Sequence, residues 1–179
     1  LRRSGLLDPS ADAVFDRYTR MASRLLGTPV ALLSLMEDNR QTTLSVYGAD
    51  LKEAPLSHSF CQHVVAGDAP LLISHTPTHP LGKINGAVAD FGAMAYAGAP
   101  VRAPGGEPLG SFCVVSDTPR VWTDGDVQVI EELAAAISNE IALRMTERRA
   151  TALVEVAALG MLMADDEGAV FEVSPSWKH

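Results

Sequence analysis

The sequence predicts an α+β domain with one central antiparallel sheet, terminal helices on one face, and a short helix plus a loop on the other. Two observations carry this prediction. Apolar segments with strand character come in neighbouring pairs joined by polar turns, which is the order of β-hairpins. Segments with helical periodicity stand at the two ends of the chain and can cover one face of the sheet. The 179 residues are 47% hydrophobic, which is enough apolar material for a core.

Residues 9–26 are predicted to form the first helix. Asp8 and Pro9 are a typical helix start, apolar side chains then recur at helical spacing, and Gly27 supplies the stop. Residues 30–48 follow as a β-hairpin, because a continuous apolar run and an alternating segment flank a polar turn. The chain therefore opens with a helix and the first pair of sheet strands.

The middle of the chain is expected to carry only small elements. Ser59 can begin a short helix over 59–66 and Gly67 can end it, and 70–74 has the character of a short strand. Residues 75–92 hold repeated prolines and glycines. This stretch is therefore expected to be mostly loop, with at most a helical turn or two.

A second hairpin joins strands over 93–102 and 109–116 through a turn rich in proline and glycine. A symmetric register pairs Gly98 with Cys113. One face then carries Met94, Tyr96, Leu109, Cys113 and Val115, and the other carries Ala95, Ala97, Ala99, Phe112 and Val114. Because both faces are apolar, we expect both to be covered.

The closing helix begins at a predicted capping box, in which Thr123 and Asp126 have the required spacing. Its apolar stripe consists of Ile130, Leu133, Ile137, Ile141 and Met145. Helical character is expected to continue to about Ala158, so residues 148–158 are predicted to be a helical linker. We expect a homodimer seam at Ala142, Met145, Ala152, Leu153 and Val156, which would pack against the partner's copy and the first helix.

Charge and cysteine usage exclude several kinds of partner. The 14 basic and 22 acidic residues give a net charge of -8, whereas a protein that binds nucleic acid needs a basic face. No apolar run reaches the roughly 18 residues of a membrane span, so we expect no membrane insertion of this fragment. Cys61 and Cys113 follow no zinc or disulfide spacing, which favours reduced thiols and a cytoplasmic location.

Three segments carry a family resemblance: "VALLSLMEDNRQT", "LSHSFCQHVVAGDAPLLI" and "YAGAPVRAPGGEPLGSFCVVSDTPR". With the closing helix, they make residues 8–147 resemble a GAF domain of the branch found in bacterial sensor kinases, cyclases and serine phosphatases. Residues 159–179 are similar to the opening of a PAS domain, which would be cut short here.

This resemblance implies a sensory or regulatory domain of a bacterial signalling protein, for example a two-component histidine kinase. Such a domain binds a small ligand or a neighbouring domain and relays the signal through its C-terminal helix to a PAS and output module. We expect no enzymatic activity in this fragment, because no catalytic signature appears in it. A kinase, cyclase or phosphatase domain is expected in the full-length protein.

The resemblance also implies a ligand pocket between the sheet and the short helix and loop. The candidate lining residues are Phe60, Cys61, His75, Phe91, Met94 and Tyr96. The sequence leaves the cofactor and the ligand unknown. Some GAF domains bind haem through a histidine in this loop region, and His75 stands where the branch more often has Asp. A histidine at this position slightly favours haem binding or a proton switch. A purely structural role for His75 is nevertheless favoured over both.

Other ligands are disfavoured on the residues present. No metal is expected, because Cys61 and His63 would point to different faces of a helix over 59–66. A covalent bilin is disfavoured by the absence of a Cys-His dipeptide and by an aromatic content of only 6%. The residue pattern of cyclic-nucleotide GAF domains is missing as well.

Two alternative functions stay open. The first is a dimerisation spacer that binds no ligand. The second is a thiol-dependent enzyme similar to free methionine-R-sulfoxide reductases, because Cys61 falls near one of their cysteine positions. That chemistry needs a second thiol, whereas Cys113 lies mid-strand, where a cysteine usually serves as a small core hydrophobe.

Overall fold

The computed structural model describes residues 9–160, 162–164 and 170–172. The chain divides into two compact units, Leu1–Ala142 and Leu143–His179. The first unit contains the sheet and its covering elements. The second contains the end of the last helix and one strand pair.

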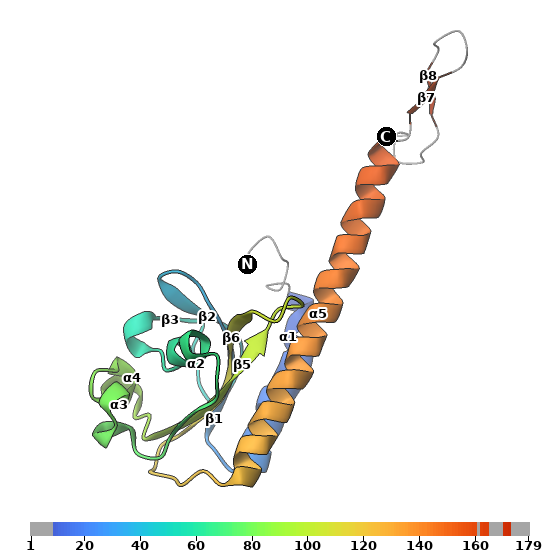
Figure 1. Ribbon diagram of the computed structural model, residues 1–179. Helices are drawn as coiled ribbons and strands as arrows, with labels where there is room; N and C mark the ends of the chain where they lie inside the picture. The colour runs from blue at the N-terminus through green and yellow to red at the C-terminus, as the bar shows by residue number, and fades with distance from the viewer. Residues whose placement is uncertain (1–8, 161, 165–169, 173–179) are drawn as a thin grey trace. The chain divides into compact units, whose positions relative to one another are not determined.

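The first unit is built on a six-stranded antiparallel sheet with strand order β3-β2-β1-β6-β5-β4 (Figure 1). Its strands are β1 (Val30–Met36), β2 (Arg40–Tyr47), β3 (Glu53–Pro55), β4 (Leu71–Ile73), β5 (Ala95–Arg102) and β6 (Pro108–Ser116). The two predicted hairpins are the β1–β2 and β5–β6 pairs, and they join side by side through β1 and β6. The predicted α+β class with a central antiparallel sheet is thus confirmed.

The helices divide between the two faces of the sheet. Helix α1 (Pro9–Leu26) and the part of α5 (Asp124–Gly160) that belongs to the first unit lie on one face (Figure 1). The other face carries the short elements η2 (Leu56–His58), α2 (Cys61–Gly67), η3 (Thr76–Thr78), α3 (Pro80–Lys83) and α4 (Gly86–Phe91). This is the predicted arrangement of terminal helices on one side and a short helix plus loop on the other.

The β5–β6 register decides which side chains face which layer. Gly98 lies opposite Cys113, as predicted from the symmetric hairpin. Because side chains alternate along a strand, Phe112 faces the long helices while Cys113 faces α2. The side chains of the helix-side layer are fully buried: Phe15, Leu33, Phe112, Val114, Ile130, Ile137 and Ile141.

Polar contacts fix both long helices to the sheet. The Ser45 hydroxyl on β2 donates to Asp16 Oδ1 on α1 at 2.6 Å. The Ser138 hydroxyl on α5 accepts the Arg102 backbone N–H on β5 at 3.0 Å. At the start of α5, Thr123 N–H donates to Asp126 Oδ2 at 3.0 Å, and Asp126 N–H donates to the Thr123 hydroxyl at 3.1 Å. The predicted capping box is therefore confirmed.

Helix α2 departs from its predicted bounds at both ends. It begins at Cys61, because Ser59 is still extended while its hydroxyl accepts the Gln62 N–H at 3.1 Å. It ends with Asp68 in the left-handed conformation, at φ 48°, although Gly67 was the expected stop. The Asp68 carboxylate pairs with the Arg102 guanidinium at 2.5 Å, so a tertiary contact supports this end.

The structure also shows elements that the sequence pattern did not indicate. The three-residue strand β3 and the helix η2 occupy 53–58, where no element was predicted. The predicted loop over 75–92 contains η3, α3 and α4. All are one or two turns or three residues long, too short for hydrophobic periodicity to reveal.

Helix α5 ends at Gly160, and the predicted linker 148–158 lies within it. In the second unit, β7 (Leu162–Ala164) and β8 (Val170–Glu172) form an antiparallel pair. Residues 165–169 and 173–179 of the segment that resembles the opening of a PAS domain fall outside the described residues. Among the described residues, no helix combines the length and the hydrophobicity that crossing a bilayer requires.

Candidate functional site

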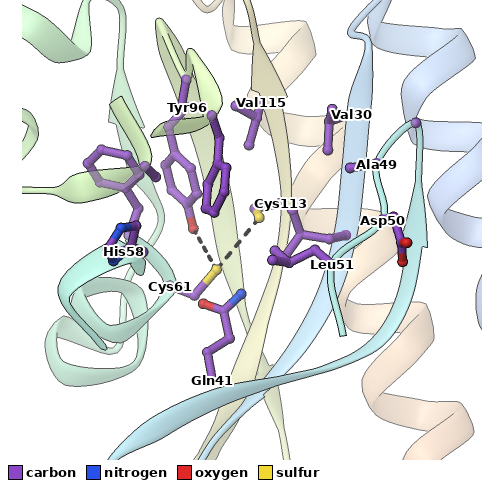
Figure 2. A pocket seen from close by; sticks show the side chains of 16 residues that line it. Val30, Gln41, Ala49, Asp50, Leu51, His58, Cys61, Tyr96, Cys113 and Val115 are labelled. Carbon is purple, nitrogen blue, oxygen red and sulfur yellow. Dashed lines mark hydrogen bonds between the residues drawn. The ribbon is translucent and has the colours of Figure 1, made fainter. Parts of the chain in front are cut away.

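A cavity of about 370 Å³ opens on the face of the sheet that carries the short elements (Figure 2). Strands β1, β2, β5 and β6 supply its floor, and η2, α2, α4 and the segment 48–51 supply its walls. The lining residues are Val30, Leu32, Gln41, Gly48, Ala49, Asp50, Leu51, His58, Phe60, Cys61, Ala87, Phe91, Ala93, Tyr96, Cys113 and Val115.

The cavity brings together four of the six residues expected from the sequence: Phe60, Cys61, Phe91 and Tyr96. The other two do not line it. His75 precedes η3, and its Nδ1 is hydrogen-bonded to the Thr78 hydroxyl at 3.0 Å. Met94 lies just before β5, and the neighbouring Ala93 faces the cavity in its place. Both residues lie in the irregular segments beside β4 and β5, into which strand alternation does not extend.

Tyr96 is the central aromatic side chain of the cavity floor. Its ring packs 5.1 Å from the Phe60 ring, between centroids. It leans over Gly98, where a Cβ atom would lie 2.5 Å from the Tyr96 hydroxyl and 2.8 Å from the Cys113 Cβ. Glycine at this position therefore lets the Tyr96 hydroxyl reach the sulfur of Cys61.

Cys61 and Cys113 lie side by side at the bottom of the cavity (Figure 2). Their Sγ atoms are 3.6 Å apart, and both thiols are free. The Tyr96 hydroxyl donates to Cys61 Sγ at 3.4 Å and lies 3.3 Å from the Ser111 hydroxyl. Sequence reasoning placed each cysteine in its own element, but only the packing of α2 on β6 reveals the pair.

This arrangement separates the acidities of the two thiols. Hydrogen bonding from Cys113 lowers the pKa of Cys61 to about 6, with further help from the hydroxyls of Ser34, Tyr96 and Ser111, and outweighs the opposing effect of burial. Burial and the interaction with Cys61 raise the pKa of Cys113 well above its usual value. Cys61 is therefore the thiolate of the pair near neutral pH.

Gln41 on β2 is a polar group of the cavity that sequence reasoning missed. Its side chain is only 3% exposed, and its Oε1 accepts a hydrogen bond from the Ser59 hydroxyl at 2.5 Å. That bond orients the amide so that its NH₂ group is directed to the cavity (Figure 2). Simple alternation along β2 would place Gln41 on the face opposite Leu44 and Val46. The register of β1 and β2 shifts between Leu33 and Ser34, so no spacing in the sequence indicated that Gln41 faces the cavity.

The rim on the α4 side is held by a histidine and an aspartate. His58 Nε2 lies 2.8 Å from Asp90 Oδ2, and its Nδ1 lies 2.9 Å from the Ser57 hydroxyl. Phe91 stands 5.8 Å from the His58 ring, between centroids, and is 60% exposed. The rim therefore presents an exposed aromatic side chain to solvent.

The charge of the lining limits what the cavity can bind. None of the sixteen lining residues is a lysine or arginine, and Asp50 adds a carboxylate. Three or more metal-ligating side chains do not cluster anywhere in the described part of the chain. The lining therefore offers apolar contact and hydrogen bonds, with no lysine or arginine to neutralise an anionic ligand.

Comparisons with known proteins agree with this architecture. The family model described as GAF domain matches residues 10–141. A cyclic di-GMP phosphodiesterase of Pseudomonas aeruginosa is 32% identical over 139 residues, which cover 76% of this chain and 24% of that protein. The chain thus spans about a quarter of that relative's length.

Solved structures share the fold at low sequence identity. The PixJ GAF domain of Thermosynechococcus elongatus, in its blue-light absorbing form, has a TM-score of 0.66 at 16% identity and covers 80% of this chain and 92% of its own. A domain of a two-component sensor histidine kinase protein from Sinorhizobium meliloti has a TM-score of 0.62 at 14% identity, with coverages of 80% and 99%. The free methionine-R-sulfoxide reductase of Neisseria meningitidis has a TM-score of 0.61 at 12% identity, with coverages of 74% and 78%.

Proposed function

We propose that this chain, which belongs to the GAF domain family, is the sensory domain of a longer signalling protein and binds a small molecule in the cavity beside α2. The observation that carries the proposal is the cavity itself, with the oriented amide of Gln41 at its wall. A concave, mostly apolar site with a few convergent polar groups is the usual form of a small-molecule site.

The lining defines the chemical class of the ligand. Phe60, Tyr96 and Leu51 provide an apolar surface, and the Gln41 amide offers N–H donors to an acceptor atom. An anionic group would meet the Asp50 carboxylate and no lysine or arginine of the lining. The ligand is therefore a neutral or cationic molecule with an apolar body and one hydrogen-bond acceptor, and a cyclic nucleotide does not fit this description.

The test uses a neutral, apolar fluorescent probe, 1-aminoanthracene, on purified protein. Wild-type protein should bind it with a rise in fluorescence. Leu51→Trp, which fills the cavity, should abolish that rise, while Leu72→Trp on the exposed side of β4 should retain it. Native mass spectrometry of the protein from its cells then identifies the natural ligand. A chain that binds no probe and carries no adduct is instead a spacer domain.

The relay step of this proposal runs through the terminal helices. The large side chains of Leu143, Leu153 and Val154 on α5 are more than half exposed, and Met21 and Leu25 on α1 are exposed as well. We expect α5 to pair with its copy in a homodimer and to pass movements of the sensory domain toward a PAS and output module. In the full-length protein that output would be a kinase, cyclase, phosphatase or phosphodiesterase.

Sedimentation analysis tests the dimer. The chain should sediment as a dimer, and a form lacking residues 146–179 should dissociate at the same concentration, because it loses the exposed apolar side chains of Leu153 and Val154. Leu153→Glu in the complete chain should have the same effect, whereas Thr151→Glu, at a polar position of the same helix turn, should not. Two monomeric forms at high concentration would contradict the relay through a dimer.

A further inference from the structure

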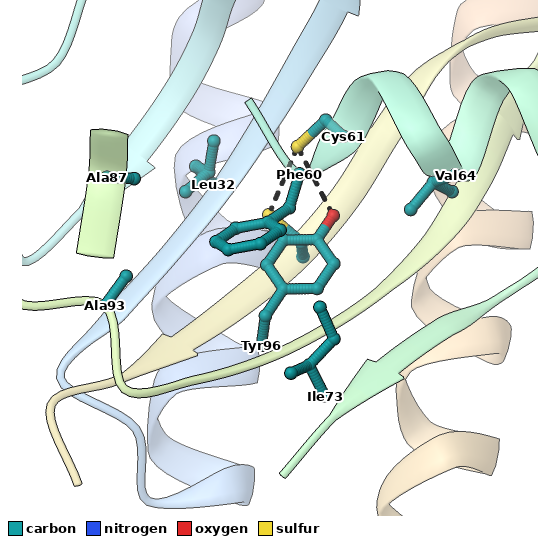
Figure 3. Close-up of a cluster of buried hydrophobic side chains, with 9 residues drawn as sticks. Leu32, Phe60, Cys61, Val64, Ile73, Ala87, Ala93 and Tyr96 are labelled. Carbon is teal, nitrogen blue, oxygen red and sulfur yellow. Dashed lines mark hydrogen bonds between the residues drawn. The ribbon is translucent and has the colours of Figure 1, made fainter. Parts of the chain in front are cut away.

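The buried cluster around Cys61 and Cys113 differs from an ordinary core. Cys61 is 3% exposed and Cys113 is fully buried, among the apolar side chains of Leu32, Phe60 and Val64 (Figure 3). A cysteine that serves only as a small hydrophobe needs no polar neighbour. Here the two sulfur atoms contact each other and are surrounded by hydroxyl groups, so the cluster has a polar centre.

The sulfur atoms are close enough to form a covalent bond after a small movement. They are 3.6 Å apart, and a disulfide bond is about 2.05 Å long, so they must approach by about 1.5 Å. Cys113 lies in the central strand β6, while Cys61 is the first residue of α2, a helix of seven residues at the surface of the sheet. We therefore expect Cys61 and α2 to make most of the movement that brings the two sulfur atoms together.

Hydrogen bonding from Cys113, and then from three hydroxyl groups, makes Cys61 the more nucleophilic thiol. Ser34, Tyr96 and Ser111 stabilise its thiolate by hydrogen bonding, as the S–H of Cys113 does. Cys113 keeps its proton and stands next to Cys61. This is the division of roles that two-step thiol oxidation requires: one thiolate attacks, and a neighbouring thiol then resolves the product.

Access distinguishes this pair from thiols sealed inside a core. Both cysteines line the cavity, which opens to solvent beside Asp50 and Phe91. A volume of about 370 Å³ admits a molecule of the size of hydrogen peroxide. Buried cysteines are normally inert because reagents do not reach them. Here Cys61, which is 3% exposed, is the thiol that a reagent in the cavity meets, while Cys113 stays fully buried.

We propose that Cys61 and Cys113 form an oxidation site, at which a small hydroperoxide that enters the cavity converts the two thiols into a reversible disulfide bond. The Cys61 thiolate attacks one oxygen of hydrogen peroxide, an S–O bond forms, the O–O bond breaks, and hydroxide leaves. Cys113 sulfur then attacks the Cys61 sulfenic acid, an S–S bond forms, the S–O bond breaks, and the Cys113 proton leaves with the hydroxyl as water. The two sulfurs lose two electrons, and the peroxide gains them.

The experiment is peroxide titration of the reduced chain of 179 residues, followed by blocking of free thiols and mass spectrometry. Wild-type protein should lose both thiols and the mass of two hydrogen atoms, and digestion should yield one cross-linked peptide pair that contains Cys61 and Cys113. Dithiothreitol should restore both thiols. This test needs no ligand in the cavity, so its outcome is independent of the ligand-binding proposal.

Two variants assign the order of the steps. Cys113→Ser should stop at Cys61 sulfenic acid, seen as one added oxygen atom and trapped by dimedone. Cys61→Ser should leave Cys113 unmodified under the same conditions. Cross-links between two chains, oxidation that begins at Cys113, or irreversible addition of oxygen without the Cys61–Cys113 cross-link in wild-type protein would each overturn the proposal. The wild-type measurement alone decides the case if a variant does not fold.

Discussion

The two faces of the sheet are filled in opposite ways. On the helix side, a continuous row of apolar side chains from α1 and another from α5 pack on the sheet. Phe112, Ile137 and Ile141 are completely buried there. On the other side, five short helical segments of three to seven residues cover the same strands and leave a cavity of about 370 Å³. A long helix matches a sheet along its whole length, whereas short segments joined by turns pack less regularly.

The two faces also differ in chemistry. Successive residues of β6 show this directly, because Phe112 belongs to the dense layer and Cys113 to the cavity. The cavity side concentrates the thiol pair, the Tyr96 hydroxyl and the Gln41 amide. One side of a sheet can therefore provide stability while the other keeps space and polar groups for binding.

The largest expected effect comes from emptying the dense face. Phe112→Ala should lower the free energy of unfolding by about 3–5 kcal/mol, because it removes a fully packed ring and leaves a new cavity. The matched change Phe60→Ala, beside the existing cavity, should cost at least about 1 kcal/mol less, because fewer packed contacts are lost. Urea unfolding of both variants measures the difference. Equal losses of unfolding free energy in the two variants, or an unchanged urea midpoint for Phe112→Ala, would show that the two faces do not differ in packing.

A second test measures the acidity of the Cys61 thiol on the cavity side of the sheet. Titration of the thiolate absorbance in the ultraviolet should show one group with a midpoint near pH 6, assigned to Cys61 and absent in Cys61→Ser. Cys113→Ala should raise that midpoint, because hydrogen bonding from Cys113 is the largest cause of the low pKa. The other titratable side chains near Cys61 are Tyr96 and Cys113, whose pKa values are raised, and His58 and Asp50, which also line the cavity. A midpoint near 9 in wild-type protein would contradict the assignment.

The lowered pKa of Cys61 also makes the stability of the fold depend on pH. The folded pKa of Cys61 lies below the usual value of 9.0, so its ionised form contributes stability that is complete above that usual value and is lost as the pH falls through about 6. The urea midpoint of wild-type protein should therefore rise between these pH values relative to that of Cys61→Ser. Parallel pH profiles would show that the thiolate contributes nothing.

A smaller effect is expected at the start of α5. Burial opposes ionisation of Asp126, but hydrogen bonds from Thr123 and the Arg120 guanidinium outweigh it and lower the pKa of this carboxyl. Asp126→Asn should cost about 1 kcal/mol, the usual value of a helix cap. Asp124→Asn, two residues earlier in the first turn of α5, should cost less and serves as the matched control. If both variants unfold alike in urea, the capping box does not stabilise the helix.

The contribution of Asp126 also has a defined pH window. Because its folded pKa is lowered, the stability it adds is complete above the usual carboxyl value of 3.8 and is lost as the pH falls through the lower folded value. The difference in urea midpoint between wild-type and Asp126→Asn should therefore shrink in acid. A difference that stays constant down to the acid transition would point to packing rather than charge.

The smallest expected effect is on catalysis. The sequence carries no complete set of catalytic groups, so the fragment with a thiol reductant should not turn over free methionine sulfoxide, in spite of its cysteine pair. Wild-type protein and Cys61→Ser should give the same background rate. Turnover by wild-type protein that Cys61→Ser abolishes would make the cavity a catalytic site.

The sequence by itself determined the features that depend on neighbouring residues. Hydrophobic periodicity predicted α1 and the apolar stripe of α5, and the spacing of Thr123 and Asp126 predicted the capping box. The two apolar strands joined by a short turn predicted the pairing of Gly98 with Cys113. In each case the interacting groups lie within one helix or one hairpin, so local spacing fixes the geometry.

Only the tertiary structure decided the contents of the cavity. Cys61 and Cys113 are 52 residues apart, and Gln41 meets Ser59 across 18 residues. Their meeting depends on where α2 packs on β5 and β6, and no spacing in the sequence encodes that position. His75 and Met94 do not line the cavity. They lie in irregular segments, which follow neither the period of a helix nor that of a strand. Periodicity fixes the face of a regular element, and long-range packing selects which faces meet.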